Sequence, residues 1–381
     1  MEINYICEWN NNKKLTWSGT TYSLYEALKN KFDVLDNGFV LSPKQKRFLK
    51  FKALYLYKGK IHSKLYNKGL LKYYQSHVDN ILTKKDNIIL EIGDLGISKK
   101  NDYYIYQDLS FDFLIDFSYK NKQLFDYSGF QTYSKKDLKK RAQYQKEIYS
   151  KAKGIFTMSK FLKEHLVNYT NIPENKVHYI GAGTNLDTKL VKPDNKNRNK
   201  ILFVGRDFYR KGGELVCQAF RIVKKDLMDN AELYIIGPSS KDMEDIKNKY
   251  GYPGINFVGE VNDKEELSKY FNLCDIFCMP SRFEAYGIAF IEALIYGLPC
   301  IGRKNFAMNE IIQNHENGLL IDDDNAKKLA YKIVELLKND KIFNRVNQDR
   351  DKYIKEYSWD TVAEKIKNVF EKDAEKRKNE N

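Results

Sequence analysis

The 381-residue sequence lacks several features that would place it in a specialised class of protein. It has five cysteines, too few for the disulfide scaffold of a secreted protein of this length. No apolar run approaches the roughly 20 residues that a membrane-spanning helix needs. The first residues show no basic segment followed by an apolar core, so we expect no signal peptide. The sequence therefore predicts a reduced, cytoplasmic protein.

Common metal and nucleotide motifs are also missing. Cys274 and Cys278 have C-x3-C spacing, but no second Cys/His pair follows to complete a metal site. The segment from Gly205 to Gly212 matches neither G-x4-G-K-[ST] nor G-x-G-x-x-G. No Asp-x-Asp pair suited to a divalent ion stands out, and residues 322–324 are interpreted as a helix-capping turn. We therefore expect neither a metal nor a resident cofactor.

Positive charge is abundant. The formal net charge is +14 and the isoelectric point is near 9.1, which favours anionic partners such as nucleic acid, an acidic membrane surface or phosphorylated substrates. Residues 42–75 interleave lysines with tyrosines and phenylalanines. This pattern suits an anionic lipid interface, single-stranded nucleic acid or an ordinary solvated helix face, and composition alone leaves the three open.

Apolar strands alternate with helical segments along both halves, so the sequence predicts an α/β protein with two Rossmann-like, doubly wound parallel-sheet domains. We expect an N-terminal domain over residues 1–190, a C-terminal domain over residues 191–357, and a polar linker over residues 187–200. The expected strands are 2–7, 32–35, 87–92, 103–108, 154–159, 176–180, 200–206, 231–237, 255–259, 275–279, 300–302 and 317–321. Residues 118–152 are expected to be a long helical region.

The most informative stretch runs from Cys278 to Cys300. It predicts a strand end, a loop with Glu284, and an almost wholly apolar helix that Gly297 ends. Glu292 lies in the middle of that helix, where a carboxylate is costly unless it has a partner. The helix N-terminus suits an anion, so two interpretations remain: a nucleotide site, or a core helix whose glutamate bonds to backbone.

Two further segments carry chemistry-bearing side chains. Arg206 and Lys211 flank a loop that follows a strand and opens a helix, which suits a diphosphate or an ordinary surface loop. Asp108 follows another strand, at the end where parallel sheets bind ligands, although such an aspartate also caps turns.

Taken in order, these motifs resemble one family. Gly205-Arg-x4-Lys211-Gly, Pro280-Ser281, Glu284-x7-Glu292-Ala and Gly297-x-Pro299 are similar to the donor half of family 4 glycosyltransferases, which have the GT-B fold. Asn309-Glu310-Ile-Ile, Asn317-Gly318-Leu and Tyr357-Ser-Trp359 extend the resemblance. It covers the second half densely and the first half loosely, through Gly19 and Gly181-Ala-Gly183.

The resemblance implies two domains facing a cleft, with a C-terminal helix (residues 358–381) that returns to the first domain. It implies that Arg206 and Lys211 hold the diphosphate of a nucleotide-sugar, Glu292 its ribose and Glu284 the transferred sugar. The backbone at Tyr286, Gly287 and Ile288 would direct a helix N-terminus at the phosphate, and Gly19 would let a loop close over the donor. Asp108 takes the place of a family histidine or acid, which leaves its role open.

The implied function is metal-independent, retaining transfer of a UDP- or GDP-linked sugar to a glycan or lipid-linked glycan in cell-surface polysaccharide synthesis. The protein would be cytoplasmic, with residues 42–75 as a possible contact to the inner membrane face. Two alternatives remain: a nucleotide-sugar epimerase on the same fold, although no His cluster lies near Glu284, and a basic nucleic-acid-binding protein, although no module signature is found.

Overall fold

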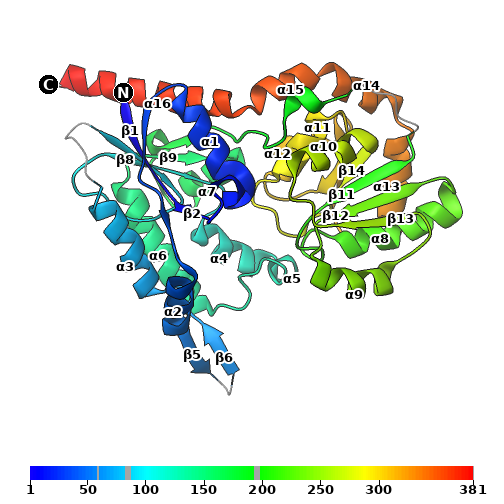
Figure 1. Cartoon of the computed structure of the whole chain (residues 1–381), viewed down its shortest axis with the longest axis horizontal. Coiled ribbons are helices and arrows are strands. Elements are labelled where there is room, and N and C mark those ends of the chain that lie inside the picture. Colours follow the sequence, from blue (N-terminus) through cyan, green and yellow to red (C-terminus); the bar gives the residue numbers. More distant parts are fainter. Residues whose placement is uncertain (58–59, 82–86, 193–197, 381) are drawn as a thin grey trace. The chain divides into compact units, whose positions relative to one another are not determined.

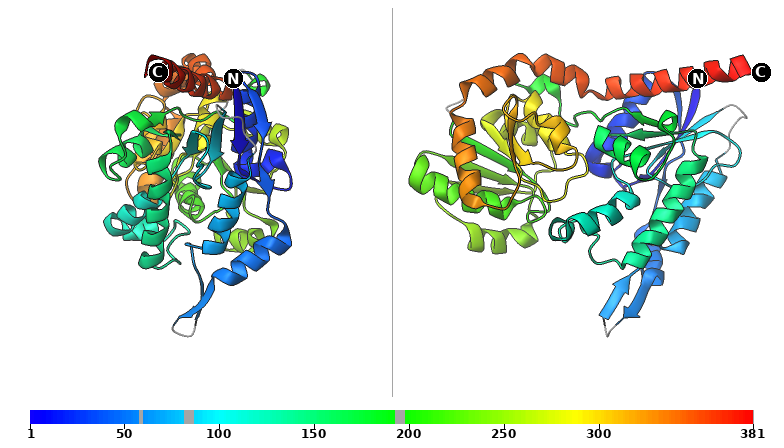
Figure 2. Two further views of the ribbon diagram at one scale, coloured as in Figure 1. Left: turned by 90° about the vertical axis from the view of Figure 1, so that its left-hand side faces the viewer. Right: turned by 180° about the vertical axis from the view of Figure 1, so that it is seen from behind.

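The computed structural model describes residues 1–57, 60–81, 87–192 and 198–380. The chain divides into two compact units, each built around one six-stranded sheet (Figures 1 and 2). Unit 1 contains Met1–Gly183 and Ser358–Asn381, and unit 2 contains Thr184–Tyr357. Both units alternate strands with helices, which is the predicted α/β class. Among the described residues, no helix is both long and apolar enough to cross a bilayer.

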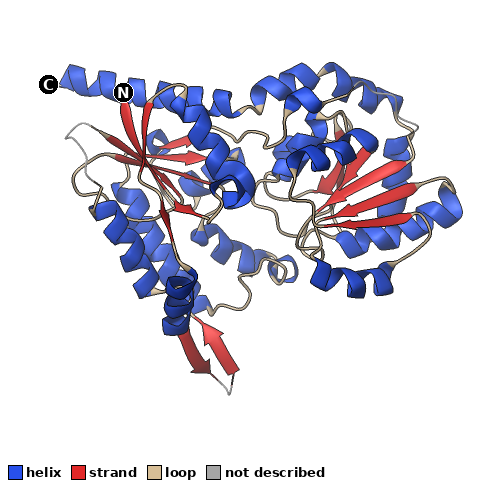
Figure 3. Cartoon of the chain, viewed as in Figure 1, coloured by secondary structure: helices blue, strands red, loops and turns tan. Residues whose placement is uncertain are grey.

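The sheet of unit 1 is parallel throughout, in the order β10-β9-β8-β7-β1-β3. Figure 3 draws its strands in red. Its strands are β1 (Glu2–Ile6), β3 (Asp33–Asp36), β7 (Ile88–Ile92), β8 (Tyr103–Gln107), β9 (Gly154–Thr157) and β10 (Val177–Tyr179). Its helices are α1 (Thr20–Lys29), α2 (Pro43–Ala53), α3 (Lys68–Asp79), α4 (Phe111–Lys120), α5 (Lys122–Phe125), α6 (Lys135–Lys151), α7 (Lys160–Asn168) and α16 (Trp359–Glu380). The long helical region expected at 118–152 is therefore three helices.

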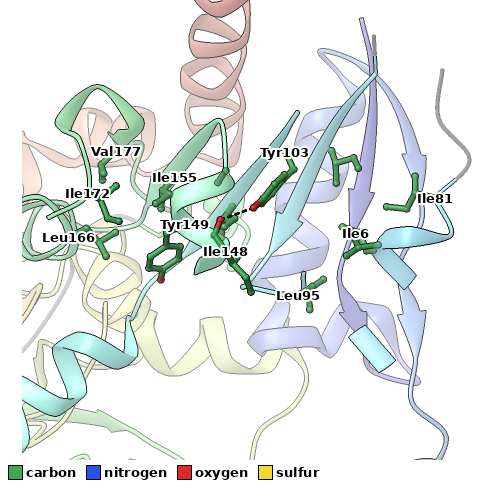
Figure 4. Packing of buried hydrophobic residues seen from close by; sticks show 14 of the residues in the cluster. Ile6, Ile81, Leu95, Tyr103, Ile148, Tyr149, Ile155, Leu166, Ile172 and Val177 are labelled. Atoms are coloured by element: carbon green, nitrogen blue, oxygen red, sulfur yellow. Dashed lines mark hydrogen bonds between the residues drawn. The ribbon is translucent and has the colours of Figure 1, made fainter. Parts of the chain in front are cut away.

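The central strands of unit 1 are buried on both faces. On one face, Tyr103 and Ile105 of β8 pack with Ile148 and Leu162 from α6 and α7, and the Tyr103 hydroxyl donates to the Ile148 carbonyl at 2.6 Å (Figure 4). On the other face, Tyr104 packs against α16. Every residue of β7 and β8 is buried, which explains why these strands show no alternation of apolar and polar side chains.

The sheet of unit 2 is also parallel, in the order β13-β12-β11-β14-β15-β16. Its strands are β11 (Lys200–Val204), β12 (Glu232–Ile236), β13 (Ile255–Gly259), β14 (Ile276–Cys278), β15 (Cys300–Arg303) and β16 (Gly318–Ile321). Its helices are α8 (Gly213–Ile222), α9 (Ser240–Tyr250), α10 (Lys264–Leu273), α11 (Ile288–Ile295), α12 (Met308–Ile311), α13 (Ala326–Leu337), α14 (Asp340–Gln348) and α15 (Arg350–Glu356). Strand order reverses beside β11, so the loops after β11 and β14 meet where open α/β sheets bind ligands.

The polar segment after residue 184 belongs to unit 2 and is not a free linker. The amide of Asn185 donates to Glu292, and the Tyr296 hydroxyl donates to the Asp187 carbonyl at 2.8 Å. Asn272 donates to the Leu190 carbonyl, also at 2.8 Å. These bonds place the division at Gly183–Thr184, earlier than the expected boundary at residue 190. Residues 193–197 of the expected linker lie outside the described residues.

The basic segment at residues 42–75 has two structurally different parts. Its end packs into unit 1: the Tyr74 hydroxyl donates to Glu8, and Tyr73 packs edge-on against Phe39. Its beginning forms α2 and a small antiparallel hairpin of β5 (Leu54–Tyr57) and β6 (Lys60–Ser63), which extends away from the six-stranded sheet of its unit (Figure 2). The sequence did not predict this hairpin, nor the two-stranded pairing of β2 (Glu8–Trp9) with β4 (Phe39–Val40).

Helix α16 closes the second face of the unit 1 sheet. Phe370 is fully buried, with ring centroids 4.7 Å from Tyr104, 5.8 Å from Phe156 and 5.8 Å from Phe32. The Lys365 ammonium donates to the Ile180 carbonyl at 3.2 Å. This face of the unit 1 sheet is therefore covered by the end of the chain.

We expect Phe370→Ala to destabilise unit 1 by about 3–5 kcal/mol, because it removes a buried ring and leaves a cavity between the sheet and α16. Thermal unfolding followed by circular dichroism measures the loss. Lys372→Ala, an exposed position on the same helix, is the control and should change little. Equal midpoints for the two variants would show that α16 does not hold the sheet.

Candidate functional site

The loop between β14 and α11 ends at an uncapped helix N-terminus. Gly287 has φ of 99° and precedes the first helical residue, Ile288, with no side chain bonded to the exposed amides. A Cβ at Gly287 would meet the Phe290 ring at 2.9 Å, so this turn requires glycine twice over. Tyr286 is buried beside it. The arrangement leaves backbone N–H groups at the positive end of α11 available to an anion.

Glu292 is buried in α11, with 8% of its surface exposed. Its Oε1 atom accepts from the Asn185 amide at 3.2 Å. Burial raises the pKa of Glu292 to about 7, and the Asn185 amide and the charge of Lys264 lower it only in part. The carboxyl therefore has one backbone partner and capacity for further donors, such as vicinal hydroxyl groups.

Lys211 and Glu284 come together across the two loops. The Lys211 ammonium and the Glu284 carboxylate form an ion pair whose side chains are 15% and 12% exposed. Burial lowers the pKa of Lys211, and the charge of Glu284 opposes that shift. Arg210 reinforces the pair, with Nη1 4.0 Å from Glu284 and 2.8 Å from the Phe283 carbonyl. A residue expected to bind phosphate and one expected to bind sugar thus neutralise each other.

Arg206 lies apart from this pair in its contacts. Its side chain is 63% exposed and donates to Asn262 at 2.8 Å, with Glu260 at 3.3 Å. Backbone geometry fixes the start of its loop, because a Cβ at Gly237 (φ 118°) would come within 2.4 Å of the Gly205 carbonyl carbon. The backbone next to Arg206 is therefore fixed, whereas its guanidinium is exposed to solvent.

Arg282, which joins the two loops, was not predicted from the sequence. It is 3% exposed, and its guanidinium contacts Glu214 at 2.6 Å, Asp324 at 2.8 Å and the Tyr209 carbonyl at 2.6 Å. Asp324 also pairs with Arg303, and Asn325 caps α13. The expected capping role of residues 322–324 is therefore wrong for Asp324. An arginine inside the buried Pro280–Phe283 segment was the signal available in the sequence.

Unit 1 contains a separate cavity of about 420 Å³ at the carboxyl ends of β1, β7 and β8. Asp108 follows β8 and lines it, together with aromatic, carboxylate and amide side chains that include Trp17, Phe111, Phe130, Glu8, Asp94 and Gln145. Gly19 does not line the cavity. It ends a turn in which Trp17, Ser18 and Gly19 all have positive φ (48°, 58° and 98°), and Trp17 and Thr21 on either side do line it.

Two acids at this cavity, the half-buried Asp94 and the buried Glu91, were also missed. Asp94 forms an ion pair with Arg141 at 2.6 Å. Glu91, within β7, is fully buried; its Oε2 accepts from the amides of Leu95 and Gly96, and burial raises its pKa to about 8. The signal for Glu91 was the one that singled out Glu292, an acid inside an apolar run.

The sequence and the fold of this chain are both similar to those of known proteins. Residues 187–353 match the family model described as glycosyl transferases group 1. Unit 2 is a glycosyl transferase group 1 domain. An uncharacterised glycosyltransferase of Methanocaldococcus jannaschii is 32% identical over 239 residues, which are 57% of this chain and 59% of that protein. A GDP-mannose-dependent α-(1-6)-phosphatidylinositol monomannoside mannosyltransferase of Mycobacterium tuberculosis is 26% identical over 217 residues, 51% and 55% of the two chains.

Solved structures extend the likeness in fold to both units of the chain. Sucrose-phosphate synthase from Thermosynechococcus elongatus superposes with a TM-score of 0.70 at 17% identity, over 97% of this chain and 98% of that one. A protein of Anabaena in complex with UDP and glucose gives 0.65 at 13% identity, over 98% and 100%. The predicted GT-B type of fold, with two Rossmann-like domains, is confirmed. The finer assignment to family 4 stays a prediction, as do the roles of the individual site residues.

The buried acid of this glycosyl transferase domain has a consequence for pH. Since its folded pKa is raised from 4.5 to about 7, the folded protein keeps a proton that the unfolded chain loses in that window. The contribution of Glu292 to the free energy of unfolding is therefore largest below pH 4.5 and falls as the pH rises to about 7. We expect Glu292→Gln to abolish this slope and to be more stable than wild type at pH 8, by up to about 3 kcal/mol.

Thermal midpoints across pH 4.5–8 measure this slope. Glu316→Gln, an exposed acid of the same unit, is the matched control and should keep the wild-type profile. Parallel profiles for wild type and Glu292→Gln would contradict the raised pKa.

The Lys211–Glu284 pair makes a second prediction. Removing either partner leaves a largely buried charge, at a cost on the order of 3 kcal/mol. Glu284→Gln should cost more than Lys211→Met, because Arg210 still faces Glu284 in the second variant. The double variant should recover most of the loss, as measured by the thermal midpoint of the purified chain. Costs that simply add would mean that the two side chains are not coupled.

Proposed function

We propose that the protein is a retaining glycosyltransferase that moves a sugar from a UDP- or GDP-linked donor to a glycan or lipid-linked glycan acceptor in cell-surface polysaccharide synthesis. The chain spans only about 59% of the first relative it matches, so the activity of the whole protein is inferred from its sites. The observation that carries the proposal is Glu292 in α11, a buried carboxyl with spare acceptor capacity behind an uncapped helix N-terminus.

In this proposal, the ribose hydroxyls of the donor complete the partners of Glu292, and the diphosphate lies at the amides of Gly287 and Ile288. Arg206 and Lys211 add positive charge to the same group. A hydrogen bond from a hydroxyl to a buried carboxylate is charge-assisted and strong, so the burial of Glu292 serves recognition. UDP in the Anabaena structure and GDP-mannose in the name of the Mycobacterium relative support a nucleotide-sugar donor without choosing the base.

Lys211 and Glu284 neutralise each other as an ion pair. We infer that donor binding breaks this ion pair. The Lys211 ammonium then binds the diphosphate, and the Glu284 carboxylate accepts hydrogen bonds from hydroxyl groups of the sugar. Both groups exchange one ionic partner for another, so neither is left buried without a counter-group. Arg210 lies close enough to Glu284 to balance its charge after the exchange.

The proposed reaction breaks the bond between the anomeric carbon and the diphosphate oxygen. Its electron pair leaves with the diphosphate, where Arg206, Lys211 and the α11 N-terminus stabilise the new negative charge. The acceptor hydroxyl forms the new bond on the same face of the sugar and passes its proton to the departing phosphate. Because these fixed positive groups meet the leaving group, we propose that no metal ion or resident cofactor is needed.

The unit 1 cavity suits the acceptor. Aromatic side chains pack on the apolar faces of sugar rings, while carboxylate and amide oxygens accept from their hydroxyls. Asp108 would orient the attacking hydroxyl or stabilise the positively charged sugar. We further propose that the enzyme works at the cytoplasmic face of the membrane, where residues 42–75 meet anionic lipid and lipid-linked acceptors are found.

The test starts from the donor. A thermal-shift panel of UDP- and GDP-sugars identifies the one that stabilises the chain. With that donor, Arg206→Ala and Glu292→Ala should each lower nucleoside diphosphate release at least about 100-fold, because each removes a group that contacts the leaving nucleotide. Arg345→Ala and Glu316→Ala, exposed residues of the same unit, should retain wild-type rates. Full activity in folded Glu292→Ala would refute the donor site.

A further inference from the structure

One part of unit 1 combines positive charge with exposed apolar side chains. Between Asp36 and Asp79 the sequence contains ten lysines and arginines and no acid. Helix α2 and the β5–β6 hairpin carry many of the exposed residues of this segment and are called here the basic arm (residues 43–63, of which the structure describes 43–57 and 60–63). The basic arm extends from its own unit, as Figure 2 shows from two sides.

Four large apolar side chains of the basic arm face solvent. Phe48 and Phe51 are 57% and 72% exposed and lie three residues apart, on one face of α2. Leu56 and Ile61 are directly paired across the hairpin and are both 73% exposed. An exposed leucine and isoleucine in register, next to two exposed phenylalanines, form an apolar patch. Exposed apolar patches of this kind indicate an interaction site.

Cations surround this patch. Lys44, Arg47, Lys50 and Lys52 are all exposed on α2, and the Lys52 ammonium lies 4.3 Å from the centre of the Phe48 ring. In an amphipathic element at a bilayer, apolar side chains enter the acyl region while lysines reach the headgroups. The described part of the basic arm therefore carries both kinds of group that a peripheral membrane contact requires.

Charge and shape distinguish the possible partners. A second copy of the chain would bring two acid-free arms together, and their like charges would repel. Single-stranded nucleic acid is bound by flat rings on which bases stack. Among the hairpin side chains that the structure describes, the most exposed are the aliphatic Leu56 and Ile61. Anionic phospholipid satisfies both features, because its headgroups pair with the lysines and its chains accept leucine and isoleucine.

We propose that the basic arm is the membrane-docking element of the protein, in which Phe48, Phe51, Leu56 and Ile61 insert into a bilayer of anionic phospholipid. The inference deepens the membrane part of the proposed function and narrows the contact from residues 42–75 to residues 43–63. Tyr73 and Tyr74, in the remainder, are excluded by their packing within unit 1.

The experiment is vesicle flotation with the full chain, without nucleotide. We expect binding to phosphatidylcholine vesicles containing about 30% phosphatidylglycerol to exceed binding to pure phosphatidylcholine at least tenfold at about 50 mM salt, and to fall sharply at about 0.5 M. The variant Phe48→Ser/Phe51→Ser/Leu56→Ser/Ile61→Ser should reduce binding at least about tenfold. Lys44→Gln/Arg47→Gln/Lys50→Gln/Lys52→Gln should do the same and remove most of the salt dependence.

Two matched controls come from the same unit. Lys135, Lys136, Lys139 and Lys140 form an equally basic exposed stripe on α6, and the fourfold Gln variant there should bind nearly as wild type. Tyr119→Ser/Tyr169→Ser removes exposed rings elsewhere and should also retain binding. Donor affinity, measured separately by thermal shift, should be unchanged in every arm variant, so that a failed donor site and a failed docking surface are distinguishable.

Three results would overturn the proposal. One is the absence of flotation with anionic vesicles at low salt. The second is a dimer in light scattering that the fourfold serine variant dissociates, which would assign the patch to a second copy. The third is equal loss of binding in the α6 variant, which would reduce the effect to net charge.

Discussion

The geometry of the candidate donor site depends on one buried guanidinium. Arg282 binds two carboxylates and a backbone carbonyl, and these partners come from the loop after β11, from α8 and from the segment after β16. A buried arginine is tolerated only when its donors are matched, so these elements cannot separate without exposing an unpaired charge. Lys211 and Glu284 sit on the two loops that it joins. Arg282 therefore positions Lys211 and Glu284 for their contact, although Arg282 itself does not need to touch the donor.

Patterns local in the sequence predicted much of this structure. Both six-stranded sheets follow from apolar runs that alternate with helices, because a run buried on both faces has no polar alternation to obscure it. Glu292 was identified because an acid in an apolar helix is energetically conspicuous, and the structure supplies the Asn185 amide as its partner. The same reasoning applied to β7 would have identified Glu91, which is more fully buried than Glu292.

Features that depend on distant residues were not predictable in this way. The segment after residue 184 is polar and reads as a linker, yet Asn272 and Tyr296, about 80 to 110 residues later, bind its carbonyls. Asp324 was predicted to cap a helix because its two ion-pair partners, Arg282 and Arg303, lie about 40 and 20 residues before it in the sequence. The two ends of the segment 42–75 have a similar composition of lysines and tyrosines. Only tertiary packing shows that the end of the segment packs into unit 1 while its beginning is exposed. In each case the deciding partner lies far along the chain.

The absence of acids from the sequence of α2 also affects the helix itself. Arg47 and Lys50 are three residues apart, a spacing at which like charges destabilise an isolated helix by about 0.2–0.5 kcal/mol. Lys46, four residues before Lys50, is instead paired with Glu8 at 3.1 Å. Opposing the repulsion, the Ser42 and Gln45 side chains form a reciprocal capping box at the helix start. A negatively charged surface would weaken the repulsion within α2 as well as attract it. Helical order and surface attachment in this element are therefore thermodynamically linked, each favouring the other by the same free energy.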